Sequence, residues 1–267
     1  MKKIKGWALG ICILMFLAIV LTGCSVKASE EENKQQEITV FAAASLTESM
    51  EEIVNQFEKE NPHVKVNLHL AGSSQLRVQI EQGVKADLFL SANKKHYDAL
   101  KNKDFVLEGK HFLSNSMVVM FPKNNPAKIK TLKDIEKTCK LIVAQEEVPA
   151  GQYARQIIHS LAGELGKKYE EKVLANVVSN ENNVKQVVNK VVLGEGDAGI
   201  VYKSDITKNI KDKVNIVEIP VEHNVEAAYW MAVVKDSKEN KDVQEFYEFL
   251  LKEGQGIFEK YGFEKIH

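Results

Sequence analysis

Ser45 has the clearest chemical setting in this sequence, because it stands where a buried strand gives way to a helix. An apolar run over residues 38–44 ends at this serine, and an amphipathic helical pattern begins there. The first turn of a helix carries backbone N–H groups without intrahelical acceptors, and the helix dipole adds a partial positive charge. Such a turn can hold an anion, and the serine hydroxyl supplies one more donor.

The same strand–turn–helix arrangement recurs at three more turns, which are Gly72-Ser73-Ser74, Val148-Pro149-Ala150-Gly151 and Asn182-Asn183-Val184. Proline fixes its own φ and orients the amides that follow it, and Ala150 has nothing to offer except its N–H. Val184 can give an N–H at a helix start while its side chain packs inward. Brought together, these turns would form an oxyanion cage that contains no ionised side chain.

Each turn, taken alone, also has an ordinary structural interpretation. The pattern Ser45-Leu-Thr-Glu48 is typical of a capping box, and this is the favoured interpretation for that turn in isolation. Ser74 and Asn183 are N-cap candidates. Tyr202 ends an apolar run and can present its hydroxyl to a cleft, although a tyrosine in that position is more often core or rim. The joint occurrence of the turns is what favours a binding site.

Short apolar runs alternate with helical periods along the rest of the chain. The predicted strands cover residues 38–44, 64–70, 86–91, 116–121, 141–144, 173–178, 197–202, 214–220 and 229–234. Repeated β-α-β order indicates an α/β fold with largely parallel sheets covered by helices. Sheets of this kind bind ligands beyond the carboxyl ends of their strands, where the turns above lie.

The N-terminal segment predicts export and attachment to a membrane. Three lysines precede an apolar stretch over residues 7–21, which ends in Leu21-Thr22-Gly23-Cys24. This resembles the lipobox of bacterial lipoproteins, so we expect a signal peptide over residues 1–23 and a lipid on Cys24. An uncleaved N-terminal anchor is the alternative. Residues 24–36 are polar and predict a flexible, lipidated tether.

Composition narrows the classes of partner. The 267-residue chain has a formal net charge of -1, and loss of the three signal-peptide lysines leaves -4. No basic block or patch occurs, so nucleic acid is not expected as a partner. An anion would have to be attracted locally, against the net charge. Cys12 lies in the predicted signal peptide and Cys24 is the predicted lipid site, which leaves Cys139 as the remaining cysteine. We expect Cys139 to be a small core residue.

A series of segments, spread across the whole exported region, together resemble the molybdate-binding proteins of ABC importers. They are Phe41-Ala-Ala-Ala-Ser-Leu46, Ala71-Gly-Ser-Ser74 with Gln79-Ile80 and Gly83, Ala86-Asp-Leu-Phe-Leu-Ser-Ala92, Val148-Pro-Ala-Gly-Gln-Tyr-Ala154, Ala198-Gly-Ile-Val-Tyr202 and Ile257-Phe-Glu-Lys-Tyr-Gly-Phe263.

The resemblance implies a two-lobe, periplasmic-binding-protein-like fold of type II. Each lobe would be a mainly parallel sheet flanked by helices, with the ligand in the inter-lobe cleft. Lobe I would comprise residues 37–116 plus 227–267, and lobe II residues 117–226.

The resemblance also implies a ligand set for the oxyanion. Ser45 and Ser73 would each use N–H and O–H, Ala150 and Val184 their N–H, and Tyr202 its O–H, with Ser74 replacing Ser73 if the register slips by one. Molybdenum would be bound only as the oxyanion, and no cofactor or catalytic residue is expected. Preoriented neutral donors suffice because their bonds to a dianion are charge-assisted.

The function expected from the resemblance is capture of molybdate or tungstate outside the cytoplasm, for delivery to ABC permease subunits by a lipid-anchored monomer. Sulfate or another tetrahedral oxyanion on the same fold is the alternative. A serine hydrolase is much less favoured, because neither Ser45 nor Ser73 lies in Gly-x-Ser-x-Gly. The histidines, His96 among them, also lie in polar or helical sequence contexts typical of surface positions.

Overall fold

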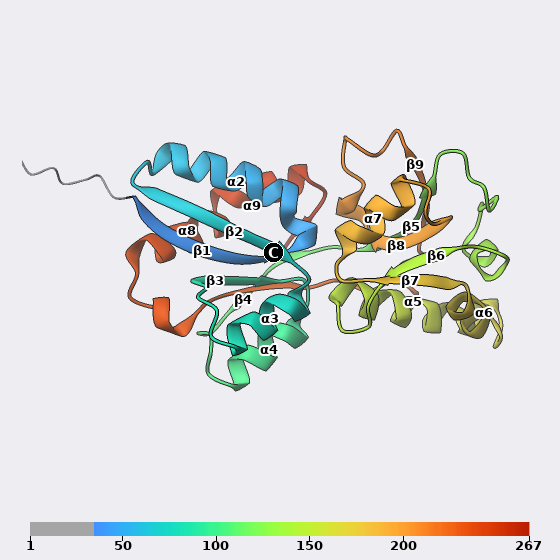
Figure 1. Cartoon of the computed structure of the whole chain (residues 1–267), viewed down its shortest axis with the longest axis horizontal. Coiled ribbons are helices and arrows are strands. Elements are labelled where there is room, and N and C mark those ends of the chain that lie inside the picture. Colours follow the sequence, from blue (N-terminus) through green and yellow to red (C-terminus); the bar gives the residue numbers. More distant parts are fainter. Residues whose placement is uncertain (1–34, 267) are drawn as a thin grey trace, which may run out of the picture. The chain divides into compact units, whose positions relative to one another are not determined.

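A computed structural model describes residues 35–266 of the chain. The predicted signal peptide, Cys24 and residues 24–34 of the predicted tether lie outside the described residues. Two β-sheets, each flanked by helices, account for residues 36–265, so the predicted α/β fold is confirmed (Figure 1). The six-stranded half and the five-stranded half are named below by their sheets.

The six-stranded half is built from both ends of the described chain. Its strand order is β11-β4-β10-β3-β1-β2. The strands are β1 (Gln36–Ala43), β2 (Val64–Ala71), β3 (Leu88–Ser91), β4 (Lys110–Ser114), β10 (Tyr229–Val233) and β11 (Glu264–Lys265). Its helices are α2 (Thr47–Glu60), α3 (Ser73–Glu81), α4 (Lys94–Asn102), α8 (Lys241–Leu251) and α9 (Glu253–Lys260).

The five-stranded half comes from the middle of the chain, with strand order β7-β6-β8-β5-β9. The strands are β5 (Met117–Pro122), β6 (Leu141–Ala144), β7 (Val177–Glu181), β8 (Ala198–Tyr202) and β9 (Val214–Glu218). Its α-helices are α5 (Pro149–Leu165), α6 (Tyr169–Ala175) and α7 (Val184–Val192). The boundaries proposed for lobes I and II from the sequence remain a prediction.

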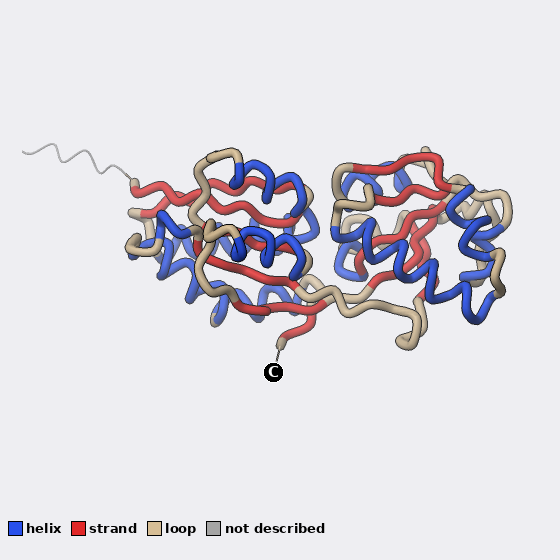
Figure 2. The backbone as a smooth tube through the Cα atoms, turned by 90° about the horizontal axis from the view of Figure 1, so that it is seen from below, coloured by secondary structure: helices blue, strands red, loops and turns tan. Residues whose placement is uncertain are grey.

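Strand directions explain how the two sheets meet. β1 runs parallel to β2 and β3, and β6 runs parallel to β7 and β8, whereas β10 and β5 are antiparallel to their neighbours. β5 and β10 are antiparallel because each enters its sheet from the other half. The chain crosses between the halves twice, near Asn115 and Ala227, whose backbone groups pair at 3.1 and 2.8 Å (Figure 2). Both crossings join carboxyl edges, so those edges face each other.

The core of the six-stranded half follows the alternation of β1. Phe41 packs on the side of α3 and α4, in one cluster with Leu76 and Tyr97. Val40 and Ala42 point to the opposite side, where α2, α8 and α9 cover the sheet (Figure 1). Because successive strand residues face opposite sides, a strand with apolar residues at every position is buried between two helical layers. The final residues of β1 thereby bring Ser45 to the carboxyl edge.

One predicted strand is shorter than expected. The apolar residues at 173–178 predicted extended structure, but residues up to Ala175 belong to α6 and β7 begins at Val177. Tyr169 and Val173 are both buried, and their spacing of four places them on one helical face. The tyrosine hydroxyl also donates to the Leu132 carbonyl at 2.9 Å, which fixes this helix in place.

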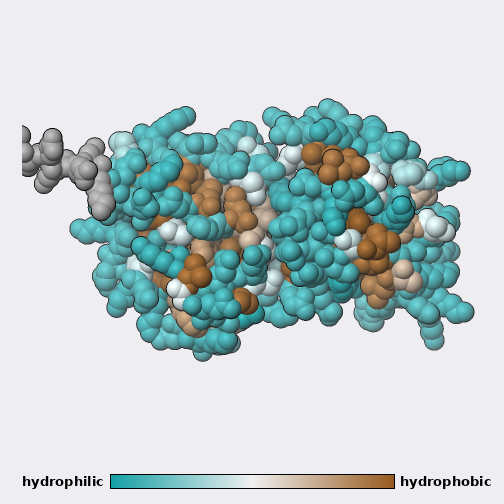
Figure 3. All heavy atoms as spheres, viewed as in Figure 1, coloured by the Kyte–Doolittle hydropathy of each residue, from teal (hydrophilic) through white to brown (hydrophobic). Residues whose placement is uncertain are grey.

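The surface seen in Figure 3 is mostly hydrophilic, with apolar side chains showing in separate places. Within residues 35–266, no helix is both long enough and apolar enough to cross a membrane. Cys139 is buried, as expected for a small core residue.

The aromatic contact between α2 and α8 gives a test of the packing. Phe57 is fully buried, and its ring centroid lies 4.8 Å from that of Phe246 and 5.3 Å from that of Phe249. We expect Phe57→Ala to lower the free energy of unfolding by about 3–5 kcal/mol, because the cavity cannot fully collapse. Urea unfolding measures this. Leu193→Ala, at a position that is 74% exposed, serves as the control and should change little. A small loss for Phe57→Ala would contradict this packing.

Candidate functional site

A small cavity lies where the two carboxyl edges meet, and it contains all five residues of the predicted ligand set. Its volume is about 10 Å³. The six-stranded half lines it with residues that include Ser45 and Ser73, and the five-stranded half with residues that include Ala150, Val184 and Tyr202. Ser74 instead lines a separate groove. The structure thus brings the predicted residues together, and their role as ligands remains a prediction.

Local sequence places the predicted ligands other than Tyr202 at or just before a helix start. Ser73 is the first residue of α3, Val184 is the first of α7, and Ala150 is the second of α5, after Pro149. Ser45 lies in a 3-10 turn, Ala44–Leu46, that leads into α2. Amides in these positions have no intrahelical acceptor, so they are available to a ligand. The residues that line the cavity, all within the described chain, include none that is charged.

Each of the two serine hydroxyls has a hydrogen-bond contact. Ser73 Oγ accepts a hydrogen bond from the Ala92 N–H at 3.0 Å, so its own proton is free to point elsewhere. Ser45 Oγ lies 2.8 Å from Tyr229 Oη, and either oxygen can be the donor. If Tyr229 donates, the Ser45 proton is likewise free for a ligand.

The Tyr202 hydroxyl is an unpaired donor at the cavity. The side chain is 1% exposed, and its Oη has no hydrogen-bond partner within residues 35–266. Its ring centroid lies 5.8 Å from that of Tyr229 and 6.4 Å from that of Tyr153. Burial raises the pKa values of Tyr202 and Tyr229 above the ordinary range, so both stay protonated. A buried, unpaired O–H is costly unless it meets an acceptor.

The capping interpretations of the first two turns are wrong. The N-cap of α2 is Leu46 with no side-chain cap, because the Ser45 hydroxyl contacts Tyr229 and the Glu48 carboxylate contacts Lys185. The N-cap of α3 is Gly72, so Ser74 is not a cap. The Asn183 interpretation is confirmed, since its side chain accepts from the Gln186 N–H. Asn183 also lines the cavity, so capping and a place in the site coexist there.

Two residues near the site were missed from the sequence. Tyr229, which contacts Ser45, opens a strand that is 184 positions away, and no local pattern marks it. His96 has a polar sequence context that suggested the surface, yet it is buried and its Nε2 lies 2.9 Å from the Glu147 carbonyl oxygen. Burial lowers the pKa of His96 to about 4, so the ring is neutral near pH 7 and donates to that carbonyl.

The two halves approach each other closely around the cavity. A Cβ atom added at Gly72 would lie 2.4 Å from the Asn182 carbonyl oxygen of the other half. Asn93 Nδ2 donates to Gln152 Oε1 at 3.2 Å, and Tyr153 Oη donates to the Ala92 carbonyl at 3.3 Å. Gly72 therefore permits a backbone approach that a side chain would block.

Within the described chain, the site lacks the side chains that metal binding or serine hydrolysis would need. Between residues 35 and 266, no group of three His, Cys, Asp or Glu side chains is arranged to hold a metal ion. The hydroxyl partners of Ser45 and Ser73 are a tyrosine and a backbone amide rather than a histidine base. What the cavity offers is a lining of hydroxyl side chains and helix-start turns that includes no charged group.

Curated relatives resemble almost the whole chain. A Bacillus subtilis protein described as a putative ABC transporter substrate-binding lipoprotein, YvgL, is 32% identical, with 92% of this chain and 93% of the relative covered. The molybdate-binding protein ModA of Mycobacterium bovis is 34% identical, with 97% and 98% covered.

Solved structures share the fold. The substrate-binding domain of a putative molybdenum ABC transporter from Clostridium difficile is 32% identical, with a TM-score of 0.64, and 86% of this chain and 99% of that chain are covered. The sulfate-binding protein SubI of Mycobacterium tuberculosis has a TM-score of 0.75 at 16% identity, with 86% and 87% covered, which shows the fold alone.

The family described as bacterial extracellular solute-binding protein matches residues 38–264. Those residues include nearly all of both sheets, both chain crossings and every residue that lines the cavity. With this match and these relatives, the chain belongs to the bacterial extracellular solute-binding proteins.

Proposed function

We propose that this solute-binding protein captures molybdate, and tungstate with it, and delivers the anion to the permease of an ABC importer. The observation that carries the proposal is a cavity lined by four helix-start turns and an unpaired, buried tyrosine hydroxyl, with no charged side chain in its lining. The relatives named for molybdate support the choice of ligand.

Neutral donors suit a fully deprotonated oxyanion. Each N–H or O–H bond to a dianion is charge-assisted, and the helix starts add partial positive charge. A protonated oxyanion such as hydrogen phosphate would bring its own donor against the donors of the site. That donor would need an acceptor, and no carboxylate lines this cavity. The cavity therefore favours molybdate and tungstate over partly protonated phosphate.

Sulfate binding on the same fold is the second candidate, and the structural likeness to a sulfate-binding protein motivates it. Sulfate is also a tetrahedral dianion, but it is smaller. Donors held at fixed positions would then make longer bonds to its oxygens, which weakens the complex. Competition between the two anions on one sample separates the candidates.

We further propose that capture involves closure of the two halves over the anion. The cavity takes its lining from both halves, so a bound anion bridges them and stabilises the closed form. The two chain crossings near Asn115 and Ala227 are the natural hinge. Lobe I and lobe II, as predicted from the sequence, are the moving bodies in this scheme.

The proposal also includes the expectations from the sequence about membrane attachment, oligomeric state, cofactor and catalysis. A lipid on Cys24 and a tether would hold a monomer at the outer face of the cell membrane, and the description of one relative as a lipoprotein supports this. The proposed role involves no cofactor and no catalysis, with molybdenum bound only as its oxyanion.

Thermal unfolding in the presence of single anions tests the proposed ligand. We expect molybdate and tungstate, at concentrations well above Kd, to raise Tm by several degrees, because a ligand that binds the folded state stabilises it. Sulfate, phosphate and carbonate should give much smaller shifts. An equal sulfate shift would discard the named ligand, and no shift with any anion would discard the site.

Two substitutions, each of which deletes one hydroxyl oxygen, test the proposed ligand Ser45 and its neighbour Tyr229. We expect Ser45→Ala to weaken molybdate affinity roughly 10- to 100-fold, because it removes a hydrogen bond to a charged group. Tyr229→Phe should cost roughly 3- to 10-fold, because it removes only the partner that orients the Ser45 hydroxyl. Isothermal titration measures both, with Tm in the absence of anion as the folding control. A Ser45→Ala variant of unchanged affinity would refute the assignment.

Gly72→Ala tests closure by steric means. The φ and ψ of Gly72 are −63° and 136°, which alanine adopts freely, so the added methyl acts only through the Asn182 carbonyl oxygen. Relief requires the halves to separate, and we expect molybdate affinity to fall by about tenfold or more while Tm without anion is unchanged. Gly163→Ala, where a Cβ meets nothing within 4 Å, is the matched control. Equal affinities for the two variants would count against closure.

A further inference from the structure

Three charged side chains that lie close in sequence to cavity-lining residues form an ion triad. Lys185 follows Val184 in the chain, Glu48 comes three residues after Ser45, and Asp205 comes three residues after Tyr202. Lys185 Nζ lies 2.7 Å from Glu48 Oε2 and 3.0 Å from Asp205 Oδ1. Each member is therefore close in sequence to a different proposed ligand.

Lys185 and Asp205 form the part of the triad that belongs to the five-stranded half. Asp205 is fully buried, and its Oδ2 accepts a hydrogen bond from the Tyr202 N–H at 3.1 Å. Burial acts to lower the pKa of Lys185, but Asp205 and Glu48 outweigh it and raise that pKa, so Lys185 stays charged. Burial also raises the pKa of Asp205, and the charge of Lys185 opposes that rise. This pair ties the start of α7 to the end of β8.

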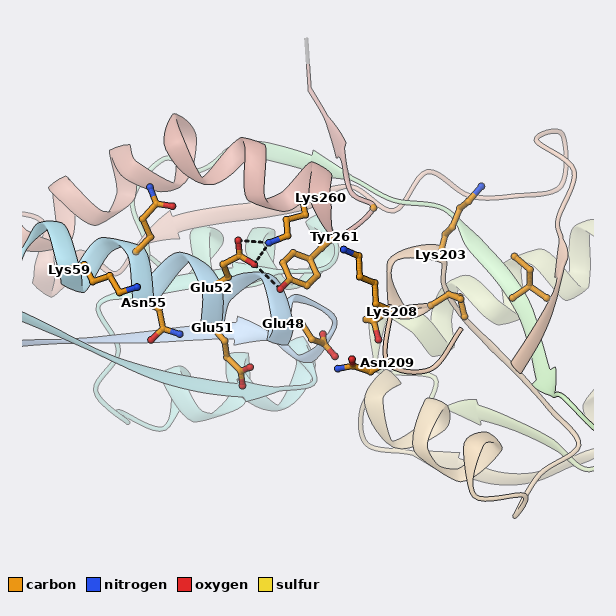
Figure 4. Close-up of a pocket in the computed structure, with 15 residues that line it drawn as sticks. Glu48, Glu51, Glu52, Asn55, Lys59, Lys203, Lys208, Asn209, Lys260 and Tyr261 are labelled. Atoms are coloured by element: carbon orange, nitrogen blue, oxygen red, sulfur yellow. Dashed lines mark hydrogen bonds and ion pairs between the residues drawn. The ribbon is translucent and has the colours of Figure 1, made fainter. Parts of the chain in front are cut away.

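Glu48 joins the triad from the other half. It projects from α2, and its two carboxylate oxygens accept from Lys185 Nζ at 3.0 and 2.7 Å. Figure 4 shows it at one end of a row with Glu51 and Glu52, which line the same groove. Glu52 bonds to Lys260 and Tyr261 of its own half, at 2.6 and 2.9 Å. Within this row, Glu48 is the acid with an ion pair to the other half.

We propose that Glu48 and Lys185 form a latch that slows release of the bound anion, an inference that rests on the proposed function. The pair joins the two halves and contacts no proposed ligand atom, so both are positioning residues. Because Lys185 is already held by Asp205, it stands ready for Glu48 whenever the halves meet. A contact that exists only in the closed form lowers the rate at which that form opens.

Glu48→Gln tests the latch, with Glu51→Gln as the matched control. Both changes remove one negative charge from α2, but Glu51 is exposed and has no ion pair in the described part of the chain. The full chain, kept in detergent, is loaded with molybdate and diluted, and release is followed by tryptophan fluorescence. With its side chain 33% exposed, Glu48 makes a partly solvated pair. We therefore expect Glu48→Gln to speed release by about two- to fivefold, with association unchanged.

Two further readouts separate a latch from a structural role. Tm without anion should be the same for wild type and Glu48→Gln, because the pair is not needed in the open form. Added salt should speed release from wild type more than from the variant, because it screens the pair. A lower Tm without anion, or an equal effect of Glu51→Gln, would overturn the proposal.

Lys185→Gln completes a double-mutant cycle. In that background the additional change Glu48→Gln should alter the release rate no further, because the partner is already gone. A full, additive effect in the double variant would overturn the latch. If the wild-type protein binds no oxyanion, the proposed function is refuted. If the wild-type protein binds molybdate but Glu48→Gln leaves the release rate unchanged, only the latch is refuted.

Discussion

The feature on which the rest of the structure depends is the meeting of two carboxyl sheet edges. The chain crosses between the sheets near Asn115 and Ala227, and each crossing joins one carboxyl edge to the other. Strand–turn–helix units place unpaired helix-start amides at such edges. Two edges that face each other therefore bring turns from both sheets to one small cavity.

The absence of charge in the cavity lining matters for the proposed function. No charged side chain lines the cavity, so under that proposal the attraction for an anion would come from N–H and O–H groups. Buried contacts surround the hydroxyl groups. The Ala92 amide occupies a lone pair of Ser73, Tyr229 contacts Ser45, and burial keeps Tyr202 protonated. The Glu48–Lys185–Asp205 triad stands outside the lining, and its Glu48–Lys185 pair joins the two halves.

Contacts between the halves surround the cavity on more than one side. Gly72 allows a backbone approach to Asn182, His96 bonds to the Glu147 carbonyl, and Glu48 pairs with Lys185. These contacts involve residues that are immediate or near neighbours of the cavity lining in sequence. Under the proposed function, binding an anion and bringing the halves together would be physically linked, since the same turns carry both the proposed donors and contacts between the halves.

The sequence by itself determined the α/β class, the position of most strands and the four turns that carry Ser45, Ser73, Ala150 and Val184, because hydrophobic period and turn composition are local signals. Tertiary structure decided what no local pattern records. The partner of Ser45 is Tyr229, 184 positions away, and the partner of Glu48 is Lys185, 137 positions away. The capping box favoured for Ser45 failed for this reason: long-range partners outcompeted the local hydrogen bonds. The burial of His96 and the choice of Ser73 over Ser74 at the cavity likewise depend on how the two sheets come together.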